Sequence, residues 1–328
     1  MKNFAKKMLV ATSAVAGVVA VAGAVSYELT KKLVKLALDR NDVQEKKKKT
    51  GLGKVISGTT ISKEILEKQK ADGEKLKNSP CRIVEMEAHD GHKLIGHWFE
   101  KKNAKRTIIA MHGWRSSWTK DFGMISEFLN GSDSNVLYVE QRGQNNSGGD
   151  YIGFGVIERF DCVEWSKWVS KNTSDDMGIY LYGISMGATT VLMSAELDLP
   201  KNVKGIIADC GFTSTHEIWK HVAEKNLHIY YKGILENIAD EMCKRKIQVG
   251  SKEVSTVKAM EHCKIPVLFI HGTNDKFVPI DMTYKNYEAC NSHKRLLIVP
   301  GAEHAMSYAI EPQRYEREVL DFFKEFDI

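Results

Sequence analysis

The chain has 328 residues, of which 43% are hydrophobic, 27% are charged and six are proline. This composition excludes collagen, low-complexity disorder and a small disulfide scaffold, and the length suits one large α/β domain or two smaller ones. The net charge of +5 is uneven: residues 1–80 hold 17 Lys and Arg against 8 Asp and Glu, whereas the remainder holds 30 against 34. The mildly acidic body argues against a nucleic-acid partner.

Residues 1–25 are predicted to be a hydrophobic anchor or a signal. Met8 to Val25 is an uncharged run of 18 residues that follows three lysines, and its length is close to that of a transmembrane helix. Ala22-Gly23-Ala24 resembles a signal-peptidase site, so cleavage and secretion are the alternative. The small Ala and Gly side chains make the run only weakly hydrophobic.

Residues 26–80 begin with a basic stretch in which leucines at positions 29, 33, 36 and 38 alternate with Lys31, Lys32 and Lys35. This pattern is typical of an amphipathic helix on an anionic membrane surface. Two membrane signals in succession favour a single-pass anchor in the cell membrane. The lysines on both sides leave open which side of the membrane the body faces.

The rest of this arm is a linker and a short helix. Asn41 to Gly58 is predicted to be a linker, because its charge and low hydrophobicity prevent a packed core. Ser62 to Lys77 is predicted to be a polar helix that ends before Pro80. Ile61, Ile65 and Leu66 would form its apolar face.

From Cys81 to Ile328 the chain alternates strands with helices. Arg82–Ala88 and Lys93–Phe99 are strand-like and are joined through a hairpin turn at Asp90-Gly91. Six short apolar runs suit strands buried on both faces: Thr107–Met111, Val136–Glu140, Ile179–Tyr182, Val203–Ala208, Val267–Ile270 and Leu296–Val299. Five amphipathic stretches are predicted helices: Asp121–Leu129, Glu158–Val169, Ala188–Glu196, Asp281–Ala289 and Gln313–Phe326.

This alternation predicts an α/β fold in which a mostly parallel sheet is covered by helices. One interval, residues 212–261, is helical in character and contains no clear strand. An insertion of this size between two strands is predicted to form a cap over the carboxyl edge of the sheet.

A candidate nucleophile lies in Gly183-Ile184-Ser185-Met186-Gly187, between the strand Ile179–Tyr182 and the helix Ala188–Glu196. The turn that exposes such a serine is tight, so the residues two positions before and after it must be small. The bare G-x-S-x-G pattern is common, but its strand–turn–helix setting makes Ser185 a strong candidate.

Two later loops supply the partners of Ser185. Asp275 follows the strand Val267–Ile270, and His304 follows Leu296–Val299. The carboxyl ends of parallel strands share one sheet edge, so these three side chains can converge. His304 would take the proton of Ser185, and Asp275 would fix the tautomer of His304. Asp209 is the rival acid, although Asp275 has the more suitable loop.

His112-Gly113-Trp114 follows the strand Thr107–Met111 and can aim a backbone N–H at a developing oxyanion. We expect the N–H groups of Trp114 and Met186 to form a two-donor oxyanion hole and His112 to be structural. Trp118 adjoins this loop and Trp219 lies in the cap, so both are candidate substrate-pocket residues, with simple packing as the alternative.

With these motifs in place, the span from Cys81 to Ile328 resembles the α/β-hydrolase superfamily, most of all a bacterial serine-aminopeptidase-like branch with an N-terminal membrane segment. Glu140-Gln141-Arg142-Gly143 and the following Ser147-Gly148 are similar to its D-x-R-G-x-G-x-S loop, with Glu140 replacing Asp in a structural position. The resemblance implies a mostly parallel eight-stranded sheet with helices on both faces and a helical cap. It does not identify the substrate, because esterases, thioesterases, lipases and peptidases share this scaffold.

The function expected from these residues is cleavage of carboxylic esters through an acyl-enzyme on Ser185. The substrate would be a small acyl ester or a short peptide, and no cofactor or metal motif is present in the sequence. The six scattered cysteines have no zinc spacing and suit buried thiols, although their even number permits disulfides. A serine exopeptidase or thioesterase, or a membrane-tethered binding protein that has lost catalysis, are the alternatives.

Overall fold

The computed structural model describes residues 27–40, 61–174 and 176–327. The expected anchor Met8–Val25 and the expected linker Asn41–Gly58 lie outside these ranges. Within them, the helices are too short or too polar to cross a lipid bilayer.

The core of the molecule is one eight-stranded sheet with the order β1-β2-β4-β3-β5-β6-β7-β8. Its first two pairings are antiparallel and the other five are parallel. The strands are β1 (Arg82–Glu87), β2 (Lys93–Phe99), β3 (Arg106–Met111), β4 (Ser134–Glu140), β5 (Gly178–Ile184), β6 (Val203–Asp209), β7 (Val267–Gly272) and β8 (Lys294–Val299). The predicted α/β-hydrolase fold, with its mostly parallel sheet, is confirmed.

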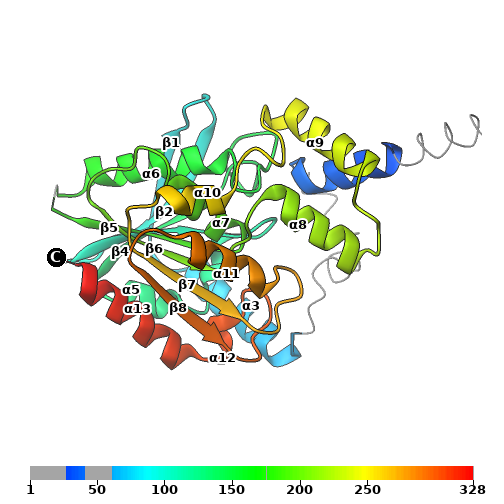
Figure 1. Cartoon of the computed structure of the whole chain (residues 1–328). Coiled ribbons are helices and arrows are strands. Elements are labelled where there is room, and N and C mark those ends of the chain that lie inside the picture. The colour runs from blue at the N-terminus through cyan, green and yellow to red at the C-terminus, as the bar shows by residue number, and fades with distance from the viewer. Residues whose placement is uncertain (1–26, 41–60, 175, 328) are drawn as a thin grey trace, which may run out of the picture.

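Helices cover both faces of this sheet (Figure 1). Alternate residues of one strand face opposite sides, so Ile109 and Met111 of β3 join one hydrophobic cluster while Ile108 and Ala110 join another. The first face is covered by α6 (Glu158–Asn172), α7 (Met186–Ser194), α10 (Thr256–His262) and α11 (Ile280–Ala289). The second is covered by α3 (Lys63–Lys77), α4 (Trp118–Phe122), α5 (Ser126–Gly131) and α13 (Pro312–Phe326), and the short α12 (Ser307–Ile310) precedes α13.

The predicted helix Asp121–Leu129 is two helices, α4 and α5, separated at Gly123. The absence of a side chain at Gly123 lets α3 approach closely, since a Cβ there would lie 2.6 Å from the backbone nitrogen of Gly73 in α3. Ser62 caps α3, accepting a hydrogen bond from the N–H of Ile65 over 3.3 Å. The expected apolar face of α3 is wrong in part: Leu66 is exposed, while Gln69, Gly73 and Leu76 are buried.

A third hydrophobic cluster joins two segments that are far apart in sequence. One is the helix of residues 27–38, which lies beside α9 (Ile234–Ile247) in Figure 1. The other consists of α8 (Thr215–His221), the π-helical turn Val222–Asn226 and α9. Helix α10 lies at the end of the expected cap span 212–261 but does not join this third cluster. It packs against α7 and α11, and its Ala259 and Met260 belong to the cluster on the first face of the sheet.

The expected helix therefore forms, and its apolar side is partly covered by the protein, while Tyr27 and Leu29 stay exposed. Val34 and Leu38 are buried against the protein. The alternation of Leu and Lys predicts a helix with one apolar and one charged face. Such a helix can pack on a protein core or lie on a membrane surface, and the pattern does not distinguish the two.

Candidate active site

Ser185 lies on the turn between β5 and α7, with φ of 57° and ψ of −119°. This left-handed conformation is uncommon for a residue with a side chain and requires tight surroundings. A Cβ on Gly183 would lie 2.2 Å from the carbonyl carbon of Gly187, and a Cβ on Gly187 would lie 1.8 Å from the carbonyl oxygen of Met111. Both glycines are therefore required by close backbone approach, and the predicted nucleophile elbow has its expected geometry.

The structure brings Ser185, His304 and Asp275 together. The Nε2 atom of His304 lies 2.8 Å from the Oγ atom of Ser185, and its Nδ1 atom lies 2.6 Å from the Oδ2 atom of Asp275. With Nδ1 protonated, His304 donates to Asp275 and can accept the hydroxyl hydrogen of Ser185. This arrangement can activate a serine as a nucleophile.

The loop after β7 holds the Asp275 carboxylate in place. Its Oδ1 atom accepts hydrogen bonds from the backbone N–H groups of Phe277 and Val278, each over 2.9 Å. The ring of His271 lies 3.2 Å from Oδ2 and contacts the carbonyl oxygen of Val278. Burial would raise the pKa of Asp275, but the charges and hydrogen bonds of His304 and His271 outweigh burial and keep its pKa well below the ordinary value.

The pKa of His304 lies above its ordinary value. Burial acts to lower it, but the charge of Asp275 and the hydrogen bond to that carboxylate raise it by more in total. The imidazolium that forms when His304 accepts a proton is therefore stabilised by Asp275.

The rival acid Asp209 occupies a different place. Its carboxylate accepts hydrogen bonds from Tyr315 Oη over 3.1 Å and from Ser307 Oγ over 3.3 Å. Its backbone carbonyl accepts the N–H of Ser185 over 2.8 Å. Burial raises the pKa of Asp209 to about 6. Asp209 thus supports the turn at Ser185, while Asp275 contacts His304.

The loop after β3 lies directly against the serine turn. A Cβ on Gly113 would lie 3.2 Å from the Cβ of Ser185, and the N–H of Gly113 donates to Asp121 Oδ2 over 2.7 Å. Met186 is the first residue of α7, where a backbone N–H has no partner within the helix. Gly113 and Met186 thus lie beside Ser185, and the oxyanion role of the Trp114 and Met186 N–H groups stays a prediction.

The two tryptophans predicted to line the substrate pocket lie in different places. Trp219 lines an apolar cavity together with Trp114, and the ring of Phe154 packs between them. Trp118 is 6% exposed and stacks on His97 with ring centroids 4.0 Å apart, on the second face of the sheet. The prediction for Trp118 is wrong because this residue begins α4, which turns its side chain into the core.

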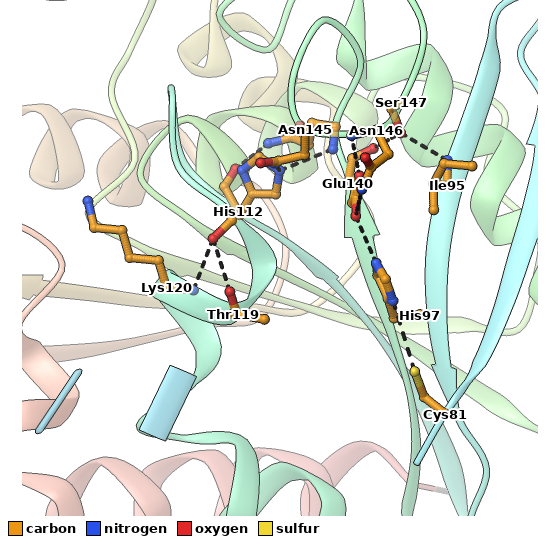
Figure 2. A network of polar contacts seen from close by, with 12 residues as sticks. Cys81, Ile95, His97, His112, Thr119, Lys120, Glu140, Asn145, Asn146 and Ser147 are labelled. Atoms are coloured by element: carbon orange, nitrogen blue, oxygen red, sulfur yellow. Dashed lines mark hydrogen bonds and ion pairs between the residues drawn. The ribbon is translucent and has the colours of Figure 1, made fainter. Parts of the chain in front are cut away.

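The loop after β4 is a network of hydrogen bonds, shown in Figure 2. The Glu140 carboxylate accepts from the N–H of Asn146 over 2.5 Å and lies 2.8 Å from His97 Nε2. Ser147 Oγ accepts the N–H of Ile95 over 2.9 Å. Glu140, which replaces the Asp of the related motif, therefore fixes this loop to β2.

Next to that network, His112 is completely buried and contacts this loop rather than Ser185. Its Nε2 atom accepts the N–H of Gln141 over 3.2 Å, and its Nδ1 atom lies 2.8 Å from the carbonyl oxygen of Gly113. His112 thus links the loops after β3 and β4, in keeping with its expected structural role.

Cys210 is the third group that, with Asp275 and His304, has ligand atoms within 4.8 Å of one another. Burial raises the pKa of the Cys210 thiol well above its ordinary value. The six cysteines are free thiols, and all but Cys81 are buried.

Some functional residues carry no signal in the sequence. Asp121 holds the oxyanion loop, His271 supports Asp275, and Phe277 and Phe154 bound the cavity. The helix of residues 27–38 also lines that cavity. Each acts through a contact that depends on how its loop or helix is folded, which residue type alone does not indicate.

The sheet order, the strained serine after β5, and the acid and histidine after β7 and β8 define an α/β-hydrolase. More narrowly, the chain belongs to the prolyl oligopeptidase family, which it matches over residues 121–326. The expected membership of the α/β-hydrolase superfamily is confirmed at that level.

Three similarities illustrate this assignment. Uncharacterized protein YqkD of Bacillus subtilis is 30% identical over 232 residues, covering 71% of this chain and 75% of that protein. Lysophosphatidylserine lipase ABHD12 of Danio rerio is 23% identical over 204 residues, covering 61% and 51%. The Pyrococcus furiosus esterase Pf2001 has the same fold, with a TM-score of 0.61, 23% identity and coverage of 77% of this chain and 95% of that one.

Proposed function

We propose that the chain is a serine hydrolase of carboxylic esters. The observation that carries this proposal is the hydrogen-bonded series Ser185–His304–Asp275 next to an apolar cavity. An esterase among the structures of this fold and a lipase among the relatives are consistent with ester cleavage.

In the proposed reaction, Ser185 Oγ attacks the carbonyl carbon of the ester while His304 Nε2 takes its proton. The N–H groups of Trp114 and Met186 stabilise the oxyanion of the tetrahedral intermediate. His304 then gives the proton to the departing alcohol, which leaves an acyl group on Ser185. Water attacks this acyl-enzyme with His304 again as base, releasing the acid and restoring the serine.

An ester is favoured over a peptide with a free amino terminus, because an exopeptidase needs a carboxylate to anchor the amine. Among the described residues, no Asp or Glu lines the cavity. Two cap carboxylates outside the cavity are paired with cations: Glu236 with Lys252 over 2.6 Å and Glu241 with Arg245 over 3.0 Å.

We also propose that the chain is held at a cell membrane through Met8–Val25. This run precedes the helix of residues 27–38 directly. On that helix and around the start of α9, four large apolar side chains are exposed, and each lines the cavity or lies within two residues of one that does: Tyr27, Leu29, Tyr230 and Ile234. Exposed apolar groups around a cavity mouth suit contact with a lipid surface from which an amphiphilic ester enters.

The test is labelling of the full chain with a fluorophosphonate, which phosphonylates an activated serine, with Ser185→Ala as the matched control. Aryl esters and aminoacyl anilides are then compared as substrates. Labelling that requires Ser185, with turnover of esters well above that of anilides, supports the proposal. A protein that remains unlabelled while correctly folded would instead indicate a non-catalytic binding role.

A further inference from the structure

The cavity beside the triad is walled by two segments that are separated by about half of the chain. The first is the helix of residues 27–38, which contributes Leu29, Thr30, Leu33, Val34, Leu36 and Ala37. The second is the cap, which contributes residues such as Trp219, Ala223 and Leu235. The empty space between these residues is about 790 Å³, including solvent at its mouth.

The cavity leads toward the reacting groups. Phe277 lines it, and the ring of Phe277 lies edge-on to His304 with centroids 4.9 Å apart. Trp114, whose N–H is the proposed oxyanion donor, lines it as well. An acyl group attached to Ser185 therefore has an apolar space beside it.

The helix is held to the body by hydrogen bonds to its last turn. Trp114 Nε1 donates to the carbonyl oxygen of Ala37 over 2.9 Å, and Arg115 Nε donates to that of Leu36 over 3.0 Å. These carbonyls have no partners within a helix and carry its negative dipole end, so a cationic donor suits them. An ion pair between Asp39 and Lys246 of α9, over 2.6 Å, ties the same end to the cap.

We propose that the helix of residues 27–38 is the outer wall of the acyl-binding site and determines which acyl chains the enzyme accepts. This inference rests on the proposed function, which it extends to a substrate class: esters with an apolar acyl chain of medium or greater length. Among the described lining residues there are no charged side chains, so the cavity suits the chain rather than a polar head group. Each buried methylene is worth roughly 0.8 kcal/mol, or about a fourfold gain in kcat/KM at most.

The test uses a substitution that fills the cavity from the helix side. Ala37→Phe places a ring among the lining residues, while Lys35→Phe places the same ring on the exposed side of the same helix. kcat/KM is measured for p-nitrophenyl acetate and p-nitrophenyl dodecanoate. Ala37→Phe is expected to lower the dodecanoate-to-acetate ratio at least tenfold, and Lys35→Phe is expected to leave both values near wild type.

A ratio that is equal in wild type, Ala37→Phe and Lys35→Phe overturns the inference while leaving the proposed function intact. If Ala37→Phe fails to fold, Leu33→Ala takes its place, and loss of contacts with the chain is expected to lower the same ratio several-fold. An unchanged ratio in a folded Leu33→Ala protein also overturns the inference.

Binding separates this inference from failure of the proposed chemistry. A fluorescent fatty acid with a 12-carbon chain is titrated into Ser185→Ala, with and without Ala37→Phe. Saturable binding that Ala37→Phe weakens supports the acyl site even in a protein that hydrolyses no ester. Binding that is absent, or is the same in both proteins, contradicts it.

Discussion

His304 Nδ1 lies 2.6 Å from Asp275 Oδ2, and the other oxygen of Asp275 accepts two backbone hydrogen bonds from its own loop. The loop hydrogen bonds thus hold the carboxylate in place independently of its contact with the imidazole of His304. This relationship determines both the orientation of His304 and the pH at which it can act as a base.

The rate should depend on pH through His304. Because the pKa of His304 is raised, its ring stays protonated to higher pH and cannot then accept the Ser185 proton. We expect kcat/KM to rise with pH, with an acid-limb midpoint above about 6.5, the ordinary histidine value. In Asp275→Asn the stabilising charge is lost, so the residual activity should have its midpoint at lower pH. A midpoint that Asp275→Asn leaves unmoved contradicts this account.

Ser185→Ala should remove nearly all ester turnover and leave the fold intact. The residual rate comes from oxyanion stabilisation and binding alone, so a loss of roughly 10⁴-fold or more is expected. Steady-state kinetics measures the loss, and thermal unfolding checks the fold. Wild-type turnover by a folded Ser185→Ala protein would remove Ser185 as the nucleophile.

Asp275→Asn and Asp209→Asn should differ sharply. The first favours the wrong tautomer of His304, with a loss in kcat of roughly 10⁴-fold. The second removes a carboxylate that contacts Tyr315 and Ser307 but not His304, and should cost far less. If Asp209→Asn proves the more damaging in kcat, the acid of the triad must be reassigned.

Asp209→Asn should also change how stability depends on pH. The folded pKa of Asp209 is about 6, above the unfolded value of about 3.9. Its contribution to stability is therefore complete below the unfolded pKa and is lost as pH rises through 6. Relative to wild type, the variant should become more stable between pH 4 and 8. A difference in Tm that is constant over this range contradicts the prediction.

Trp118→Ala and Trp219→Ala should have different effects, the first on the stability of the fold and the second on substrate selection. Trp118 is buried in the core, so its truncation should lower stability by about 3–5 kcal/mol without altering acyl-length preference. Trp219 lines the cavity, so its truncation should change the ratio of kcat/KM between long and short esters. Denaturant unfolding and the ester series measure the two effects.

The membrane proposal is tested by N-terminal sequencing and fractionation of the native protein. An intact N-terminus in a fraction that resists high salt supports an anchor through Met8–Val25, since salt removes only electrostatic binding. A mature chain that begins near Val25 or Ser26 and is found in the soluble fraction would contradict the proposal.

The sequence predicted the sheet well because buried strands are short apolar runs with clear ends. It also placed Ser185, Asp275 and His304 on loops that meet, since parallel strands share a carboxyl edge. It did not reveal that the helix of residues 27–38 packs on the cap. Val34 and Leu38 give only a general apolar pattern, and the hydrogen bonds from Trp114 and Arg115 are accepted by backbone carbonyl groups, which are the same for every residue type. Trp118 was misplaced for a related reason: closeness in sequence to the oxyanion loop does not fix the direction of a side chain.

The bonds from Trp114 and Arg115 to the carbonyl oxygens of Ala37 and Leu36 have a consequence for how such a protein can diversify. Every residue type supplies the same carbonyl, so the helix can exchange its side chains while these attachments persist. Positions 33, 36 and 37 can therefore vary in size without dismantling the catalytic body. With this helix as the proposed wall of the acyl site, substitutions in one short segment outside the family match of residues 121–326 would change the substrate range and leave Ser185, Asp275 and His304 in place.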